Sequence, residues 1–332
     1  MHIVTSPYYS IVRQKVLAGV LGKVSVECKP LMGVVAPSRL RSTYKTREMI
    51  TKVNRKALDI KTSGRSTDFI TPSFGHGCLY DCSYCYMKRN KPKGLTIAQN
   101  IGDILTEVNN HAFFTPVNKP NQTHATYTTY DISCNEDFAL HLKYHDWENI
   151  FDFFKEHPVA MGSFATKYVN LKLIEYNPEG KIRIRFSLMP QHMSDIHEPG
   201  TSKIIDRIKA INTFIDAGYD VHVNFSPVIV TETWLEDYKQ LFQMLNDYVD
   251  YKEQVLAEVI FLTHNENKHK ANLIDKPDAE AQLWSPDIQE DKISQYGGKN
   301  IRYERNLKRG YIADFRNIHS SIIPWNTIRY IF

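Results

Sequence analysis

The chain has 332 residues and a mass of 38.5 kDa, with 42% hydrophobic and 23% charged residues. This length exceeds one small domain and suits an α/β barrel with additions, and the composition excludes wholesale disorder. No stretch approaches the roughly 18 unbroken apolar residues of a membrane-spanning helix, so we expect no membrane contact. The net charge of +4 gives only a weak preference for anionic partners.

Basic side chains are concentrated in three segments. Residues 38–66 hold nine basic side chains against two acidic ones. Four more lie within 88–93, and a third group runs from Lys299 to Arg309 around Tyr303. Such clusters neutralise phosphates, and an aromatic ring among them can stack on a base. The alternative for any one cluster is an ordinary solvated basic face.

From residue 67 onward, β-rich segments alternate with segments of helical periodicity. The predicted strands are 68–73, 125–132, 159–165, 182–188, 221–229 and 257–263. The predicted helices are 97–110, 147–156, 169–176, 202–217 and 234–248. This alternation is typical of parallel strands joined by crossover helices, and six units are too few to close an eight-stranded barrel. We therefore predict an α/β fold, a partial (β/α)6 TIM-type barrel with its chemistry at the carboxyl ends of the strands.

Three regions follow from this pattern. Residues 1–65 form a basic N-terminal region, residues 66–264 form the partial barrel, and residues 265–332 form a C-terminal region that ends in aromatic residues. The barrel therefore carries an extension at each end.

Cysteine spacing is the sharpest signal in the chain. Three of the five cysteines, Cys78, Cys82 and Cys85, form a C-x3-C-x2-C motif, whereas Cys28 and Cys134 stand apart. An odd count with tight clustering indicates a metal site in a reducing compartment, the cytoplasm, and not a disulfide framework. Three thiolates on one loop can hold a 4Fe–4S cluster and leave one iron open to an external ligand.

Structural zinc is the alternative for this motif, with His76 as a fourth ligand beside the three cysteines. However, His76 lies only two residues from Cys78, whereas structural zinc sites usually pair two knuckles across a longer loop. The spacing therefore favours the iron–sulfur cluster.

The motif, with Tyr84 just before the last cysteine and a predicted strand just before the loop, resembles the signature of radical S-adenosylmethionine enzymes. The resemblance implies that the methionine moiety of S-adenosylmethionine chelates the open iron. It further implies that one-electron reduction releases a 5′-deoxyadenosyl radical.

Within that superfamily the chain is most similar to the spore photoproduct lyase family. Five segments carry the likeness in the correct order, at 82–86, 134–137, 166–167, 185–201 and 225–229. The resemblance implies a carbon–carbon lyase that repairs a thymine dimer photoproduct in DNA. The alternatives are a radical enzyme of the same family with another substrate, and a zinc-stabilised nucleic-acid-binding module without turnover.

The resemblance also assigns catalytic roles. Cys134, after the second predicted strand, is expected to return a hydrogen atom to the substrate radical, since a thiol S–H bond is weak. A small buried hydrophobe is the alternative role for such a cysteine. Tyr84 or Tyr86 is expected to relay hydrogen back to the cofactor, and Tyr86 is also expected to pack on its adenine.

Three further residues are expected to bind S-adenosylmethionine. Lys167 and Ser187, at predicted strand ends, can bind the carboxylate or amino group of its methionine moiety, and Asp137 can bind the amino group. Glu136 departs from the family pattern, which usually has a serine at this position.

The expected partners follow from the resemblance. They are DNA with a thymine photoproduct, which leaves the helical stack to react, and an electron donor such as flavodoxin or ferredoxin. We expect a monomer. The family uses a C-terminal β-hairpin as a DNA wedge, and residues 299–309 with Tyr303 are the expected hairpin.

Overall fold

The computed structural model describes residues 50–87, 94–114, 119–293 and 298–332. Most of the predicted basic N-terminal region, at 1–49, and the basic cluster at 88–93 lie outside the described residues. Cys28 does so as well.

An eight-stranded sheet forms the centre of the described part, in the order β14-β10-β9-β8-β7-β6-β3-β2. All neighbouring strands are parallel except β2 and β3. The six predicted strands are confirmed as β3, β6, β7, β8, β9 and β10, in consecutive order. The bounds are β2 Lys61–Thr62, β3 Phe69–Ile70, β6 Thr128–Asp131, β7 Ala160–Thr166, β8 Ile182–Ser187, β9 Asp220–Val228, β10 Ala257–Phe261 and β14 Ile328–Ile331.

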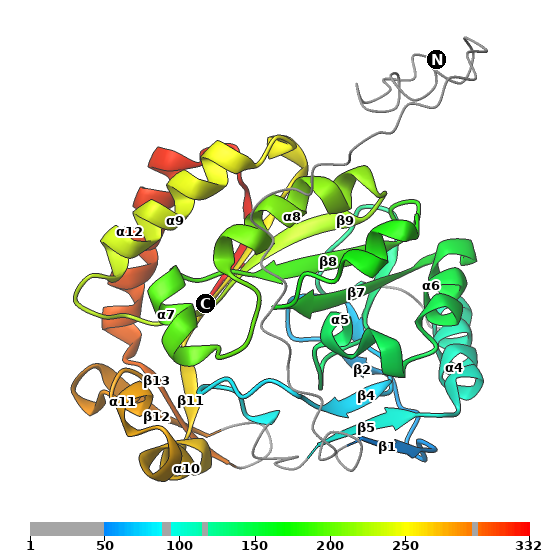
Figure 1. Ribbon diagram of the computed structural model, residues 1–332, viewed down its shortest axis with the longest axis horizontal. Helices are drawn as coiled ribbons and strands as arrows, with labels where there is room; N and C mark the ends of the chain where they lie inside the picture. The colour runs from blue at the N-terminus through cyan, green and yellow to red at the C-terminus, as the bar shows by residue number, and fades with distance from the viewer. Residues whose placement is uncertain (1–49, 88–93, 115–118, 294–297) are drawn as a thin grey trace, which may run out of the picture. The chain divides into compact units, whose positions relative to one another are not determined.

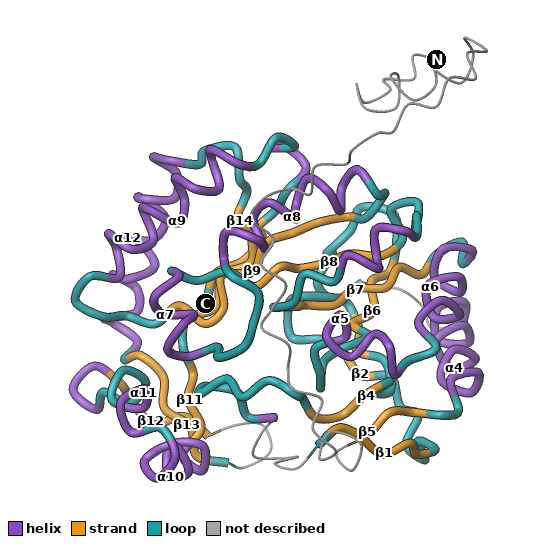
Figure 2. Tube along the Cα trace, viewed as in Figure 1, coloured by secondary structure: helices purple, strands orange, loops and turns teal. Residues whose placement is uncertain are grey.

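Long helices cover the outer side of this sheet (Figures 1 and 2). They are α4 Ile101–Phe114, α6 Trp147–Glu156, α8 Ile204–Asp216, α9 Trp234–Tyr248 and α12 Arg305–Ile322. In α6, Trp147, Ile150, Phe151 and Phe154 are buried at helical spacing, and Phe151 stacks on Phe164 of β7. The predicted partial α/β barrel is confirmed. No helix in the described ranges is long and apolar enough to cross a membrane.

Two predicted helices differ from the structure. The one expected at 97–110 begins at Ile101, because Leu95–Ala98 forms strand β5 between β1 (Ile50–Val53) and β4 (Gly75–Gly77). Pairing on both sides outweighs the helical periodicity of this short apolar run. The helix expected at 169–176 is a 3-10 turn, Leu171–Glu175, capped by the Asn170 side chain.

The prediction of a hairpin at 299–309 is wrong after residue 303, because only 299–303 form a hairpin strand. Strand β13 (Lys299–Tyr303) pairs with β12 (Gln289–Ile293) and with β11 (Thr263–Asn265), whereas Arg305 begins α12. Tyr303 is buried against Phe261 and Tyr311, and its hydroxyl accepts the Val230 N–H at 2.8 Å. Tyr303 is therefore a core residue and not a wedge.

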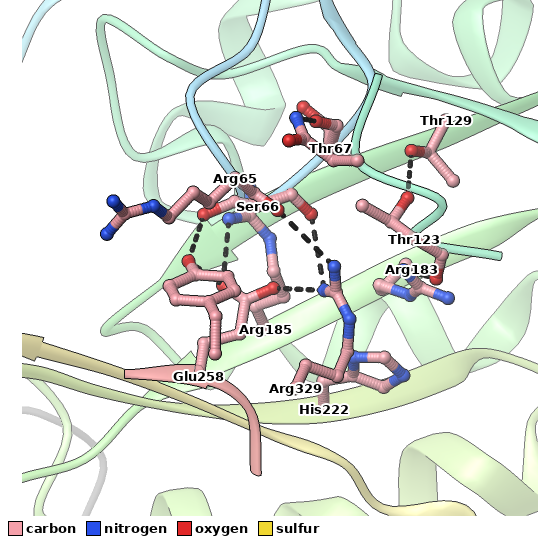
Figure 3. A network of polar contacts seen from close by, with 12 residues as sticks. Arg65, Ser66, Thr67, Thr123, Thr129, Arg183, Arg185, His222, Glu258 and Arg329 are labelled. Atoms are coloured by element: carbon pink, nitrogen blue, oxygen red, sulfur yellow. Dashed lines mark hydrogen bonds and ion pairs between the residues drawn. The ribbon is translucent and has the colours of Figure 1, made fainter. Parts of the chain in front are cut away.

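A buried ion network ties the sheet together from the inside (Figure 3). Arg185 of β8 lies 2.7 Å from Asp131 of β6 and 3.5 Å from Glu258 of β10. Glu258 also lies 2.6 Å from Arg329 and accepts a hydrogen bond from Tyr330 at 2.9 Å, both on β14. Strand β14 was not predicted, because this short segment lies outside the β/α alternation and takes its place through these contacts.

Glu258→Ala should unfold the protein more easily, because it leaves Arg185 and Arg329 buried without their shared carboxylate. We expect the free energy of unfolding to fall by about 3 kcal/mol or more, measured by urea denaturation. Glu236→Ala, which breaks an exposed pair with Lys239, is the control and should cost less than about 1 kcal/mol. Equal effects of the two variants would contradict a structural role for the network.

Candidate active site

A cavity of about 1010 Å³ opens at the carboxyl ends of the barrel strands. Tyr84, Tyr86 and Cys134 line it, and so does His76. Its other walls come from both ends of the described chain, namely from Asn54, Arg55, Lys56, Lys61, Thr263, Asn265 and Asn300. The predicted catalytic residues therefore share one cavity, at the edge where barrel enzymes carry their chemistry.

The cysteine loop, residues 75–85, begins as β4, which pairs antiparallel with β5. Cys82 is buried, Cys78 and Cys85 are half-buried, and none forms a disulfide. Burial raises the pKa of Cys78 to about 12 and that of Cys82 well above its usual value. Cys85 also raises the pKa of Cys78, and Cys85 and Cys78 both raise that of Cys82, so the thiols lie within electrostatic range of one another.

Glu136 and its histidine partners support residues 75–79 of this loop. A side chain at Gly75 would meet the Glu136 carboxylate at 2.2 Å, so only glycine fits there. His141 and His145 each bond the Oε2 atom of Glu136 at 2.9 Å. His141 Nε2 accepts the Leu79 N–H at 3.3 Å, which makes Nδ1 its donor to Glu136.

The Glu136 side chain is fully buried, so its charge has to be neutralised locally. Burial raises the pKa of Glu136, but the charge of His145 and the hydrogen bonds from His141 and His145 outweigh it and lower the pKa to about 2. The residue that departs from the family pattern is thus a buried support of the cysteine loop.

Glu198 holds the second part of the loop through Tyr84. The Tyr84 hydroxyl donates to Glu198, which also accepts from Arg207 at 2.9 Å and from Ser194 at 3.1 Å. Burial raises the pKa of Glu198, but Arg207 and Lys167 lower it overall. Burial and the Glu198 charge raise the pKa of Tyr84, so the phenol keeps its hydrogen.

A third buried glutamate, Glu280, is connected to the cysteine loop through Asn272. It ends helix α11 (Pro277–Glu280), which follows α10 (Glu266–Asp275). His264 and His269 bond its carboxylate at 2.9 and 2.6 Å, and Asn272 links it to the Ser83 carbonyl, which accepts from Nδ2 at 2.8 Å. Lys276 forms an ion pair with Asp81 at 2.8 Å. The cysteine loop is therefore supported at residues 75–79 and at 81–84.

Cys134 follows β6 and is exposed to the cavity. The Asn135 carbonyl accepts the Gly77 N–H at 3.0 Å, which joins the Cys134 segment directly to the cysteine loop. Partial burial and the nearby Asp131 carboxylate raise the pKa of Cys134 to about 12. At neutral pH this thiol is protonated and carries the S–H bond that a hydrogen donor needs.

The three residues expected to bind S-adenosylmethionine lie close to this assembly. Asp137 accepts from Thr166 Oγ1 at 2.7 Å and from the Lys167 N–H at 2.9 Å. The Lys167 ammonium lies 4.0 Å from Glu198. Burial lowers the pKa of Lys167, but the nearby Glu198, Cys82 and Asp137 outweigh burial and raise the pKa overall. The Ser187 carbonyl, at the end of β8, accepts from Arg207 at 2.7 Å.

This donor set fits the expected cofactors. Thiols are the usual ligands of iron–sulfur clusters, and the charged Lys167 near Cys82 suits an anionic carboxylate. Asn224, opposite Ser187 on β9, has a buried Oδ1 atom without a partner among the described residues.

A sequence profile of the spore photoproduct lyase family matches residues 31–332. The chain belongs to the spore photoproduct lyase family. Two curated members are among its relatives. The spore photoproduct lyase of Bacillus subtilis (strain 168) is 27% identical over 230 residues, covering 67% of this chain and 64% of the relative, less than two thirds of its length. That of Geobacillus sp. (strain Y412MC61) is 25% identical over 280 residues, covering 79% and 77%.

Solved spore photoproduct lyases share the fold. A variant with bound dinucleoside spore photoproduct has a TM-score of 0.76 at 20% identity, covering 87% of this chain and 84% of that chain. A second variant, with bound AdoMet and the same ligand, has a TM-score of 0.75 at 20% identity, covering 87% and 86%. The expected fold and family are thus confirmed.

Sequence reasoning missed the roles of Glu198, Arg207 and Arg55. Glu198 was noted only as part of the family-like segment 185–201, and Arg207 lies beyond that segment. Arg55 belonged to the basic cluster, yet it lines the cavity and its Nε donates to the Ser73 carbonyl at 2.9 Å. For Arg55 the only signal in the sequence was its place in the basic cluster. Nothing in the sequence indicated that Glu198 would pair with Tyr84 and Arg207.

Glu136→Gln should destabilise the protein in a pH-dependent way. Because the folded-state pKa of Glu136 is about 2 and an unperturbed Glu titrates at about 4.3, its charge stabilises the fold above about pH 5. That stability is lost as the pH falls toward 2. The difference in unfolding free energy between wild type and variant should therefore narrow from pH 7 to pH 3, measured by urea denaturation.

Glu148→Gln, on the exposed side of α6, is the control and should show a small difference that does not change with pH. A pH-independent difference for Glu136→Gln would contradict the charged, histidine-bonded state of Glu136.

Proposed function

We propose that this chain repairs the spore photoproduct in DNA as a radical S-adenosylmethionine lyase. This narrows the thymine dimer photoproduct expected from the sequence. The observation that carries the proposal is that a protonated thiol, Cys134, opens into the cavity shared by Tyr84 and Tyr86 while its segment is bonded to the cysteine loop. Family membership supports the same reaction.

Cys78, Cys82 and Cys85 would hold a 4Fe–4S cluster, and Lys167, Asp137 and Ser187 would bind S-adenosylmethionine. The cluster and S-adenosylmethionine, when bound and reduced by one electron, would supply the radical that removes a hydrogen atom from the lesion. The Lys167 ammonium would neutralise the carboxylate of the methionine moiety. Asp137 Oδ1 already accepts from Thr166 and from the Leu140 N–H, whereas Oδ2 accepts only the Lys167 N–H and has a lone pair left for the amino group of the methionine moiety.

Cys134 would return hydrogen to the product. Its S–H bond breaks homolytically, a C–H bond forms on the thymine radical, and the unpaired electron moves to sulfur. Tyr84 or Tyr86 would then give its phenolic hydrogen atom to the sulfur, which restores the S–H bond. The tyrosyl radical left behind would take a hydrogen atom from 5′-deoxyadenosine and so restore its own O–H bond. The bond from Tyr84 to Glu198 orients that phenol and keeps it protonated.

The DNA would meet the cavity from the side of the hairpin. The hairpin strand β12 ends at Ile293, whose side chain is 76% exposed. An apolar side chain at such a tip can be inserted between base steps, which suits the wedge that Tyr303 cannot provide. The flipped lesion would then enter the cavity.

Two further parts of the proposal concern partners. A small electron-transfer protein such as flavodoxin or ferredoxin would supply the single electron. The chain would act as a monomer.

Anaerobic reaction with a reductant, S-adenosylmethionine and a dinucleotide spore photoproduct should restore thymidylyl-thymidine, measured by chromatography. The purified protein should contain about four iron and four sulfide per chain. Formation of deoxyadenosine without loss of the lesion would point to another substrate. A protein with zinc and no iron or sulfide would contradict the proposal altogether.

Cys134→Ala should still cleave S-adenosylmethionine but should lose clean repair, because the substrate radical no longer receives hydrogen from a thiol. We expect aberrant adducts in place of thymidylyl-thymidine, identified by mass spectrometry. A normal product distribution from this variant would rule out the donor role of Cys134.

A further inference from the structure

Two cations from opposite ends of the described chain meet on one aromatic ring. The Arg65 guanidinium lies 3.9 Å from the ring centre of Phe332, and the Lys308 ammonium lies 5.5 Å from the same centre. Arg65 precedes β3, and Lys308 lies in the first turn of α12. In Figure 3 the Arg65 side chain extends away from the buried ion network. It is therefore not part of the interior charge balance.

The hairpin sheet brings further cations to this place. Arg302 lies opposite Thr263, and Lys292 lies opposite Asn300. Directly opposite residues point to the same face of a sheet, and Thr263 and Asn300 line the cavity. Arg302 and Lys292 therefore share the face of the hairpin sheet that borders the lesion cavity.

These positive charges are not balanced within the described part of the chain. Arg302 pairs with Glu290 at 2.8 Å, but Arg65, Lys292 and Lys308 form no salt bridge with any described residue. Burial lowers the pKa of Lys308 to about 8. The neighbouring charges that add to this lowering are those of Arg302, Lys292 and Arg65, and Glu290 opposes them.

We propose that Arg65, Lys292 and Lys308 form a phosphate seat for the DNA backbone that flanks the lesion. This inference rests on the proposed function and names the contact through which that site would hold a DNA strand. Unpaired cations that repel one another are stabilised by a polyanion, and DNA brings a phosphate about every 1.7 Å of its axis. The Phe332 ring keeps Arg65 and Lys308 together as the floor of the seat.

The seat predicts a particular binding behaviour. Phosphate contacts carry no sequence information, so the affinities for damaged and for undamaged duplexes should depend on the seat to the same extent. A dinucleoside lesion has no flanking phosphates and should depend on it far less.

The test compares Arg65→Gln, Lys308→Met and the double variant with Lys239→Met, a cation on the outer helix α9. Each seat variant should raise the Kd for a lesion-bearing duplex about three- to tenfold. The slope of log K against log salt should fall by about 0.9 for each lost contact. The dinucleoside kcat/KM should fall much less than the duplex affinity, and Lys239→Met should match wild type in both assays.

Duplex affinity and salt slope at the wild-type level in the double variant would overturn the inference. A loss of dinucleoside repair as large as the loss of duplex binding would overturn it too, since the seat would then act on the catalytic site. Failure of the wild type to repair the dinucleoside would contradict the proposed function, whereas duplex affinity would still report on the seat.

Discussion

A carboxylate removed from water has to be neutralised where it lies, and the position of the cysteine loop depends on three such carboxylates. Glu136 is bonded by two histidines, Glu198 by Arg207 and Tyr84, and Glu280 by His264 and His269. Each partner comes from a rigid element or from the loop itself. Moving the loop would break its hydrogen bonds from Leu79 to His141, from Tyr84 to Glu198 and from Asn272 to Ser83, so the loop is held before any cofactor chemistry begins.

The same contacts join the two halves of the proposed chemistry. The Cys134 segment bonds the loop through Gly77, and Tyr84 is linked to the end of β8 through Glu198 and Arg207. Cys134, the proposed hydrogen donor, and the expected cluster ligands are thus positioned by one connected set of hydrogen bonds. A radical must meet its donor before it meets solvent, and such a rigid arrangement serves that requirement.

The walls of the cavity come from segments that a barrel by itself would not include. Residues 54–61 supply basic and polar side chains on one side, and the β11 to β13 sheet supplies polar ones on the other. Strand β14 then joins the end of the described chain to the barrel through Glu258 and brings Phe332 beside Arg65. The proposed phosphate seat depends on this closure.

The sequence by itself determined the alternation of strands and helices, the C-x3-C-x2-C loop and the place of Cys134 after a strand. These features depend on local periodicity and spacing, which neighbouring residues encode. The tertiary structure alone decided that Tyr303 is buried, that β14 completes the sheet and that Glu136 supports Gly75. It also decided that Arg65 and Lys308 share one ring. Such pairings join segments far apart in the chain, and whether a charge is buried or a strand finds a neighbour depends on how the whole sheet closes.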